Sequence, residues 1–310
     1  MLELPESWVW DSWYVFDGEK HHAFYLRASR ALGNPDRRHR QPYIGHAIST
    51  DLKNWTVLQD AIAISDPPAW DSWTTWTGSV VKGDNGKWWM YYTGTSREDG
   101  GDIQRVGAAT SDDLLTWTKL DANPLVEADG DRYELLDYSK WHDQAWRDPW
   151  VFKHEGKWHM LITARTIEGE KFGRGVAAHA TSDDMVNWRV GEPITKPDTG
   201  FGQMEVFQVA EIHGKPTLLW CCGPRELDEE TRAKYPLGGM FSVVGESMIG
   251  PFDVSKFVWF PHPSIYAARA VKHGDTWYML GFENETDKGF GGRILDPIPL
   301  KIEGHGLVPA

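Results

Sequence analysis

The chain has 310 residues, of which 41% are hydrophobic, so it can bury a large core as one large domain or two small ones. Its 32 basic and 45 acidic residues give a net charge of −13, which argues against nucleic acid as a partner and suits a neutral or cationic ligand. The only cysteines, Cys221 and Cys222, are adjacent in an apolar stretch, which excludes an ordinary disulfide framework and a metal-ligand spacing. We expect them to be inert core thiols.

The N-terminal residues 1–6 lack the basic region and apolar segment of a secretory signal. No run of about 18 apolar residues occurs in the chain, as a membrane-spanning helix would require. We therefore expect a soluble cytoplasmic protein that has no membrane partner.

Five glycine turns divide the chain into similar units of about 60 residues. These turns are residues 17–20, 84–87, 154–157, 213–215 and 273–275. Short runs rich in aromatic and β-branched residues flank each turn, such as residues 78–82 and 88–93. This pattern is typical of β-hairpins.

An alternating run follows the hairpin in the first three units and leads into a Ser-x-Asp-x3-Trp pattern, at residues 49–55, 111–117 and 182–188. In units four and five this element is weaker, and we place it at residues 240–246 and 293–297. Four short strands per unit and five units predict an all-β fold, a five-bladed β-propeller in which residues 1–310 form one domain.

Three segments interrupt the repeat, namely residues 26–42, 121–146 and 225–236, and the last of them has the composition of a short helix. Long segments of this kind in a compact domain often carry function. We expect loops over the channel of the propeller, and the alternative is solvated surface or an oligomer contact.

Three acidic residues occupy matching positions in the repeat. Asp11, Asp148 and Glu205 each lie ahead of an apolar run and precede its glycine turn by 7, 8 and 9 residues, respectively. The innermost strand of each blade lines the channel of a propeller, so the three acids are expected to meet at one mouth of that channel.

Other residues at this level complete the expected site. Blades two and five carry Thr77 and Tyr266 there, and we expect these positions to leave room for a ligand. Trp10 and Trp13 flank Asp11, where a sugar ring can stack on an indole face.

Each acid also has a structural interpretation. Asp11 can cap a turn, and Asp148 can be a carboxylate that the adjacent Arg147 neutralises. Glu205 lies inside an apolar strand, where a charge is costly unless it is paired or functional. Three acids with unrelated structural roles would have no reason to share one position of the repeat, however. A shared position fits catalysis, because two carboxylates that flank a glycosidic bond suffice to hydrolyse it.

Five short segments, in the order of the chain, resemble the signatures of glycoside hydrolase families 32 and 68, the five-bladed invertases, fructanases and levansucrases. These segments are the Trp-Asp-Ser-Trp of 10–13, residues 44–52 with Trp55, the Trp-Thr-Gly-Ser of 76–79, the Tyr-Tyr-Thr-Gly of 91–94 and the Arg-Asp-Pro of 147–149. The likeness covers nearly the whole chain.

The resemblance implies that Asp11 is the nucleophile and that Glu205 is the general acid and then the general base. It implies that Asp148 binds furanose hydroxyls and stabilises the transition state. The activity it implies is retaining hydrolysis of terminal β-fructofuranosides, such as sucrose or fructo-oligosaccharides, without a metal or an organic cofactor. Further pocket residues that it implies are Arg147, Trp76 and Ser79.

The chain departs from the family pattern at three points. Val206 follows Glu205 where the family has cysteine, and Leu26 replaces an expected glutamine. No C-terminal β-sandwich is expected after the fifth unit. Substrate contacts are therefore expected to differ from those of typical family members.

Three other functions remain open at this point: an inverting arabinofuranosidase or xylosidase, a fructosyltransferase, and a sugar-binding propeller without catalysis. We expect His142 and Asp143 to contact the second sugar at the rim of the pocket. His21 and His22 lie beside a turn and are not expected to bind metal. The sequence is compatible with a homo-oligomer.

Overall fold

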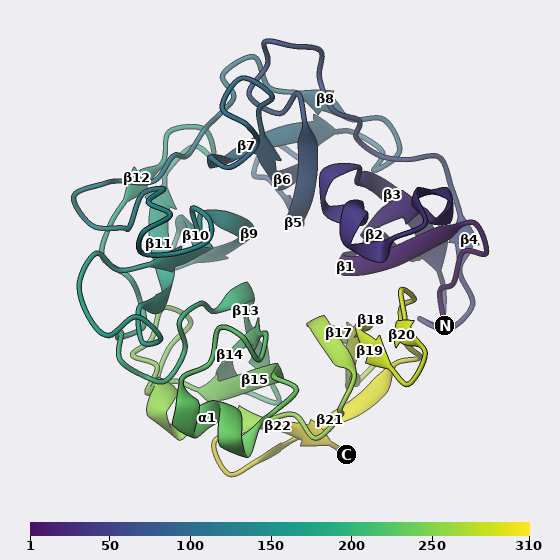
Figure 1. Ribbon diagram of the computed structural model, residues 1–310. Coiled ribbons are helices and arrows are strands. Elements are labelled where there is room, and N and C mark those ends of the chain that lie inside the picture. The colour runs from purple at the N-terminus through teal and green to yellow at the C-terminus, as the bar shows by residue number, and fades with distance from the viewer.

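Five four-stranded antiparallel sheets surround a central channel in the computed structural model, which describes all residues 1–310 (Figure 1). Within each sheet the strands follow one another in sequence order from the channel outwards. The innermost strands are β1, β5, β9, β13 and β17. The predicted all-β, five-bladed β-propeller is confirmed.

Each blade is formed by one continuous segment of the chain. Blade one contains β1 (Ser7–Phe16), β2 (His21–Ser29), β3 (Tyr43–Ser49) and β4 (Thr56–Val57). Blade two contains β5 (Thr74–Lys82), β6 (Trp88–Thr95), β7 (Gln104–Ser111) and β8 (Thr118–Lys119). Blade three contains β9 (Arg147–His154), β10 (Lys157–Arg165), β11 (Gly175–Ser182) and β12 (Arg189–Val190).

The last two blades are assembled in the same way. Blade four contains β13 (Glu205–Ile212), β14 (Lys215–Cys222), β15 (Gly239–Val244) and β16 (Val258–Trp259). Blade five contains β17 (Ile265–His273), β18 (Thr276–Glu283), β21 (Ile298–Glu303) and β22 (Gly306–Pro309), and a small separate hairpin is formed by β19 (Glu285–Thr286) and β20 (Gly289–Phe290). The helical segments are α1 (Glu229–Lys234) and the 3₁₀ helices η1 (Arg30–Leu32), η2 (Pro35–Arg40) and η3 (Val254–Lys256).

The recurring Ser-x-Asp-x3-Trp pattern forms the same turn in the first three blades. In blade one Ser49 Oγ donates to Asp51 Oδ1 at 2.9 Å, and Trp55 Nε1 donates to the Leu52 carbonyl at 3.2 Å. The residue after the aspartate has a positive φ in all three turns, at Leu52, Leu114 and Met185. This part of the repeat is therefore structural, since it ends the third strand and starts the fourth.

The hydrophobic core lies largely between the blades. Trp89 and Tyr91 of blade two pack with Trp158 and Met160 of blade three in one buried cluster. Burying one such side chain contributes roughly 1.5–3 kcal/mol, and no blade can cover both of its own faces. Neighbouring blades therefore stabilise one another, and the tryptophans of the repeat belong mainly to this packing.

The N-terminal segment closes the ring. Leu2 exchanges backbone hydrogen bonds with Ile294 at 3.0 and 2.9 Å, and the Val9 amide donates to the Gly292 carbonyl at 2.9 Å. These contacts join the first blade to the fifth.

One strand prediction was wrong in its bounds. The third strand of blade five is not residues 293–297 but β21, and the last residues of the chain form β22 beside it. Ile294 forms isolated bridges with both Phe282 of β18 and Leu2, so the predicted segment does run beside β18, but the regular strand begins only at Ile298. The His305 carbonyl accepts from the Val244 amide at 2.7 Å, which docks the β21–β22 hairpin on blade four.

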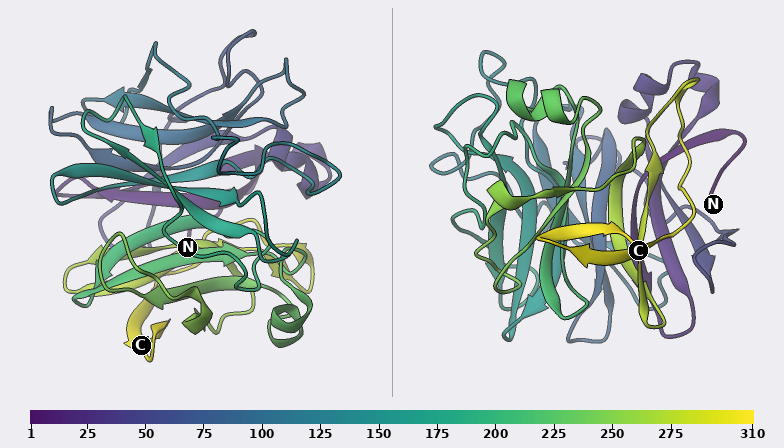
Figure 2. Two further views of the ribbon diagram at one scale, coloured as in Figure 1. Left: turned by 90° about the vertical axis from the view of Figure 1, so that its left-hand side faces the viewer. Right: turned by 90° about the horizontal axis from the view of Figure 1, so that it is seen from below.

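The long segments gather on one face of the molecule. Figure 2 shows α1 and the 3₁₀ helices of the segment 26–42 at the same end of the blades, opposite several of the β-hairpin turns. The expected short helix in residues 225–236 is confirmed as α1. None of the helices combines the length and the apolar character needed to cross a membrane.

Candidate active site

A cavity of about 590 Å³ opens at the mouth of the channel and is lined by residues from every innermost strand. These residues include Asp11 of β1, Thr77 of β5, Asp148 of β9, Glu205 of β13 and Tyr266 of β17. All three long segments that interrupt the repeat reach the cavity as well, through residues such as Arg38, His142 and Glu226. The expectation that these segments lie over the channel is confirmed.

The innermost strands are irregular at the level of the cavity. The pairing of β1 shifts between Trp10 and Ser12, and the pairing of β5 shifts between Trp76 and Gly78. Comparable shifts occur in β9, β13 and β17. Such bulges break the alternation of side chains and re-aim single residues, and they are common beside active sites.

Three bulge residues also have a positive φ that is unfavourable for a side chain. Their φ values are 60° at Asp148, 55° at Val206 and 44° at Ala267. A backbone held in this region costs about 1–3 kcal/mol per residue and persists only where the surrounding structure enforces it. The cavity level of the propeller is therefore under more conformational constraint than the strands below it.

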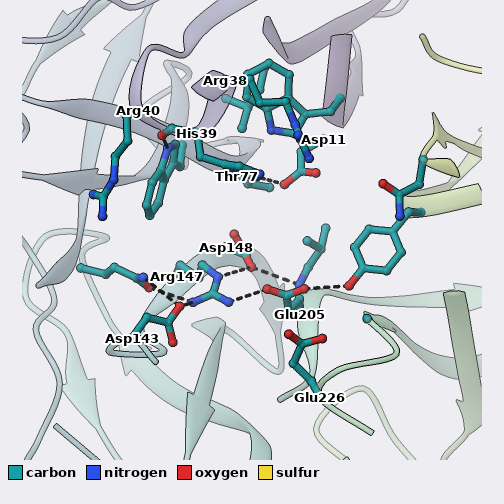
Figure 3. Close-up of a pocket in the computed structure, with 18 of the residues that line it drawn as sticks. Asp11, Arg38, His39, Arg40, Thr77, Asp143, Arg147, Asp148, Glu205 and Glu226 are labelled. Carbon is teal, nitrogen blue, oxygen red and sulfur yellow. Dashed lines mark hydrogen bonds and ion pairs between the residues drawn. The ribbon is translucent and has the colours of Figure 1, made fainter. Parts of the chain in front are cut away.

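Asp11, Asp148 and Glu205, here called the acid triad, all face this cavity (Figure 3). Asp11 accepts a short hydrogen bond from the hydroxyl of Thr77. Removal from bulk water raises the pKa of Asp11, and the charge of Glu205 adds to this effect. The Thr77 hydrogen bond acts in the opposite direction.

Asp148 is the most enclosed member of the acid triad, with 3% of its surface exposed. Its Oδ2 accepts from the Thr163 hydroxyl at 3.0 Å and from the Val206 amide at 3.3 Å. Burial raises the pKa of Asp148 to about 7, although the nearby Arg147 guanidinium lowers it.

Glu205 is held by several donors. Its Oε2 accepts from the Tyr266 hydroxyl at 2.8 Å, and its Oε1 accepts from Gln203 Nε2 at 3.2 Å and, in a short contact, from Arg147 Nη2. Arg147 also donates to Asp143 Oδ2 at 2.9 Å. The carboxylate therefore has a fixed orientation at the edge of the cavity.

Five of the seven residues predicted to bind substrate line the cavity, namely Trp10, Trp76, Arg147, His142 and Asp143. Trp13 does not line it: this side chain is completely buried and stacks near Phe24, so its prediction as a substrate contact was wrong. Ser79 is also buried outside the cavity, where its hydroxyl accepts from the Val151 amide at 3.1 Å. Its prediction as a substrate contact was likewise wrong.

Sequence reasoning missed several cavity residues. Thr77 and Tyr266 were expected to leave room for a ligand, whereas each donates a hydrogen bond to a member of the acid triad. Glu226, in the segment before α1, was not singled out, although burial and the charge of Glu205 raise its pKa to about 7. No sequence pattern distinguishes Glu226 from the other acids of its charged segment.

The sequence matches a known protein family. The model described as "Glycosyl hydrolases family 32 N-terminal domain" matches residues 11–290. The chain belongs to this family. The matched region contains the whole acid triad and all five glycine turns.

Curated proteins of similar sequence match the chain over part of their length. Fructan 1-exohydrolase of Aegilops tauschii is 32% identical over 300 residues, which cover 84% of this chain and 46% of that protein. Sucrose-6-phosphate hydrolase of Bacillus subtilis (strain 168) is 31% identical over 171 residues, which cover 54% of this chain and 31% of that protein. Across these comparisons the chain spans between about a quarter and a half of the length of its curated relatives.

Solved structures share the fold of this family 32 chain. An inulosucrase from Halalkalicoccus jeotgali bound to kestose has a TM-score of 0.79 at 21% identity, over 100% of this chain and 92% of that chain. A family 32 β-fructofuranosidase from Bombyx mori has a TM-score of 0.72 at 19% identity, over 99% of this chain and 65% of that chain. At these identities the likeness demonstrates the propeller architecture alone.

The raised pKa of Asp148 predicts a pH-dependent stability for this family 32 domain. Between its ordinary value of 3.8 and its folded value of about 7, the folded state keeps a proton that the unfolded chain has lost. Stability therefore falls as pH rises through this window, by up to about 1.4 kcal/mol per pH unit for one such group.

We accordingly expect Asp148→Asn to raise the melting temperature by a few degrees above about pH 7 and to have no such effect near about pH 4. Thermal unfolding followed across this pH range measures the difference. Asp183→Asn, at an exposed carboxylate, is the control. Equal melting temperatures of Asp148→Asn and wild type at every pH would contradict the raised pKa.

Proposed function

We propose that the protein is a retaining glycoside hydrolase that releases terminal β-fructofuranosyl units from sucrose, fructo-oligosaccharides or related fructans. The observation that carries this proposal is the convergence of the acid triad, from three different blades, in one cavity of a family 32 domain. The names of the relatives, a fructan exohydrolase and a sucrose-6-phosphate hydrolase, support the substrate class.

The proposed reaction has two steps, and a side chain of this chain serves each of them. In the first, Asp11 attacks the anomeric carbon while Glu205 gives its proton to the leaving oxygen. In the second, Glu205 takes a proton from water, and this water releases the sugar from Asp11. Asp148 is proposed to bind ring hydroxyls and to stabilise the positive charge that develops on the sugar.

The surroundings of the acid triad fit this division of roles. Asp11 has a single side-chain hydrogen bond, from Thr77, which aligns one oxygen and leaves the other free to attack. Glu205 is held from opposite sides by Arg147 and Tyr266, which suits a group that must deliver a proton in one direction.

The outer part of the cavity is proposed to hold the leaving group. In Figure 3, Glu205 appears between Asp11 above and Glu226 below, and the Arg147–Asp143 pair lies to its left. His142 and Arg225 are exposed at this rim. A volume of about 590 Å³ is within the range of roughly 300–1,000 Å³ found for small-molecule sites.

The configuration of the first product tests the proposal. We expect incubation with sucrose, inulin, levan and kestose, followed by NMR within the first minutes, to show release of β-fructofuranose, the anomer of the substrate. Release of the α-anomer would indicate the inverting arabinofuranosidase or xylosidase type of reaction, with aryl arabinofuranosides as comparison substrates.

The same experiment addresses the other two functions. Longer fructo-oligosaccharides that appear at high sucrose concentration would indicate a fructosyltransferase. Sugar binding without any turnover of the whole panel would indicate a non-catalytic propeller. The cytoplasmic location and the self-association expected from the sequence stay predictions.

A further inference from the structure

Arg269 is a buried arginine that lies one level deeper in the channel than the acid triad. It belongs to β17, and only 1% of its surface is exposed. Its Nη1 donates to the Val206 carbonyl at 3.0 Å and, in a short contact, to the Phe207 carbonyl, and its Nη2 donates to the Gly78 carbonyl at 3.4 Å. It forms no ion pair with a carboxylate.

The carbonyls that Arg269 binds belong to the bulge of β13, which carries Glu205, and to the bulge of β5, which carries Thr77. Val206 follows Glu205 directly, and its amide donates to Asp148 Oδ2 at 3.3 Å. Gly78 follows Thr77, the hydrogen-bond donor to Asp11. Val206 therefore links Arg269 to Glu205 and Asp148. Gly78 and Thr77 link it to Asp11.

These contacts cross the channel. Figure 1 shows β17 and β5 on different sides of the channel, with β1 between them. Backbone hydrogen bonds within a blade cannot join β17 to β5, because the two strands belong to blades five and two. A long side chain with several donors, such as that of Arg269, can link these bulges directly.

Arg269 also places a positive charge near two carboxylates, those of Asp148 and Asp11, without forming an ion pair with either of them. Burial lowers the pKa of Arg269 to about 10, so the guanidinium stays protonated at neutral pH. Its cation packs over the Trp150 ring at 4.9 Å. The charge of Arg269 in turn lowers the pKa of Asp11.

We propose that Arg269 is a positioning residue of the hydrolytic site, which ties the bulges of β13 and β5 together across the channel and holds a permanent positive charge below the acid triad. This inference rests on the proposed function. Arg269 does not line the main cavity and is not proposed to contact substrate.

A second cavity gives access to Arg269 from the other end of the channel. Arg269 forms part of the wall of a cavity of about 280 Å³, together with Trp150, Phe16 and Trp277. Phe16 is at the end of β1 that leads into the first hairpin turn, so this cavity opens at the other mouth of the channel. A small cation can therefore reach the position of Arg269 without passing the acid triad.

Two substitutions separate the two roles of Arg269. Arg269→Lys keeps a charge, but its single ammonium nitrogen cannot span the carbonyls of two blades as Nη1 and Nη2 do, so kcat is expected to fall by about 10- to 100-fold with little change in KM. Arg269→Gln removes the charge as well, so the acidic limb of the kcat/KM profile is expected to move to higher pH. The direction follows because the charge of Arg269 lowers the pKa of Asp11.

Several other charged groups surround these carboxyls and must stay in place during the test. Besides Arg269 itself, those acting on Asp11 and Asp148 are Glu205, Arg38 and Arg147, and those acting on Arg269 also include Tyr14 and Cys221. None of them is altered by the two substitutions.

Arg165 provides a matched control, since it is another arginine with 1% of its surface exposed. Its Nε donates to Glu134 Oε1 at 2.9 Å, and its guanidinium packs over Trp141 at 3.7 Å. Arg165→Gln is expected to lower the melting temperature but to leave the acidic limb in place. A shift of the limb equal to that of Arg269→Gln would overturn the proposal.

Chemical rescue completes the test. In Arg269→Ala, added guanidinium ion at concentrations far below those that unfold proteins is expected to restore part of kcat, because it can enter the vacated space through the second cavity. Guanidinium is expected to give no recovery to Arg165→Gln. An unchanged pH profile in Arg269→Gln together with no rescue of Arg269→Ala would overturn the proposal.

One readout is independent of any hydrolytic activity. NMR titration of isotope-labelled aspartate carboxyls, assigned with Asp11→Asn, is expected to show a higher pKa for Asp11 in Arg269→Gln than in wild type. If the wild type cleaves no fructoside but this shift is seen, the proposed function fails while the electrostatic role of Arg269 stands. An unshifted Asp11 would overturn that role whatever the substrate.

Discussion

Asp11→Asn is expected to reduce turnover of a fructoside by about 10⁴-fold or more, while the melting temperature stays within a few degrees of that of wild type. Asparagine has nearly the same shape and can still accept the Thr77 hydroxyl hydrogen bond. It cannot form the covalent bond to the sugar that the proposed mechanism requires. Steady-state kinetics and thermal unfolding of the same preparation give both values.

Asp17→Asn is a suitable control for this experiment, because Asp17 follows the same strand but lies in the exposed turn after it. We expect its turnover to equal that of wild type. Wild-type-like hydrolysis by Asp11→Asn would remove Asp11 from the mechanism. Azide offers a positive test: in Asp11→Gly it can take the place of the nucleophile and give a fructosyl azide of inverted configuration.

The fold was largely predictable from the sequence because its signals are local. Each glycine turn is a hairpin, and the Ser-x-Asp-x3-Trp pattern is a self-contained turn in the first three blades. The error in blade five has a different origin. Ile294 pairs not only with Phe282 of its own blade but also with Leu2, a partner almost the whole chain away, and no local pattern indicates such a contact.

The acid triad was predictable because its members repeat with the blades, but the other residues of the site were not. In a regular strand neighbouring side chains point to opposite faces. Here the neighbours Trp10 and Asp11 both line the cavity, and so do Trp76 and Thr77. The bulges of β1 and β5 make this possible, and beyond the bulge of β1 the Trp13 side chain packs in the core.

The same bulges explain why Thr77 and Tyr266 were misjudged. The alignment of the five repeat units correctly predicts that both residues lie beside the channel. It does not predict the direction in which their side chains point. A bulge depends on pairing with the next strand and on contacts across the channel, such as those of Arg269. These are tertiary properties that strand alternation does not encode.

Glu205→Gln is expected to show a rate loss that depends on the leaving group. For sucrose or kestose, whose leaving oxygens need a proton, kcat/KM is expected to fall by about 10²- to 10⁴-fold. For an aryl fructoside the first step needs no proton donor and is expected to change little. The second step still lacks its base, so the fructosyl-enzyme accumulates and both kcat and KM fall.

Glu226→Gln is the matched control for this last experiment, because it removes a carboxyl from the same cavity without touching Glu205. It is expected to change kcat/KM for natural and aryl substrates by similar factors, since Glu226 is not proposed to transfer a proton. A burst of aryl alcohol with Glu205→Gln, absent with Glu226→Gln, would assign the acid and base steps to Glu205. If Glu205→Gln slowed both substrates equally, the proton donor would have to be sought elsewhere in the cavity, and Glu226, with its raised pKa, would be the first candidate.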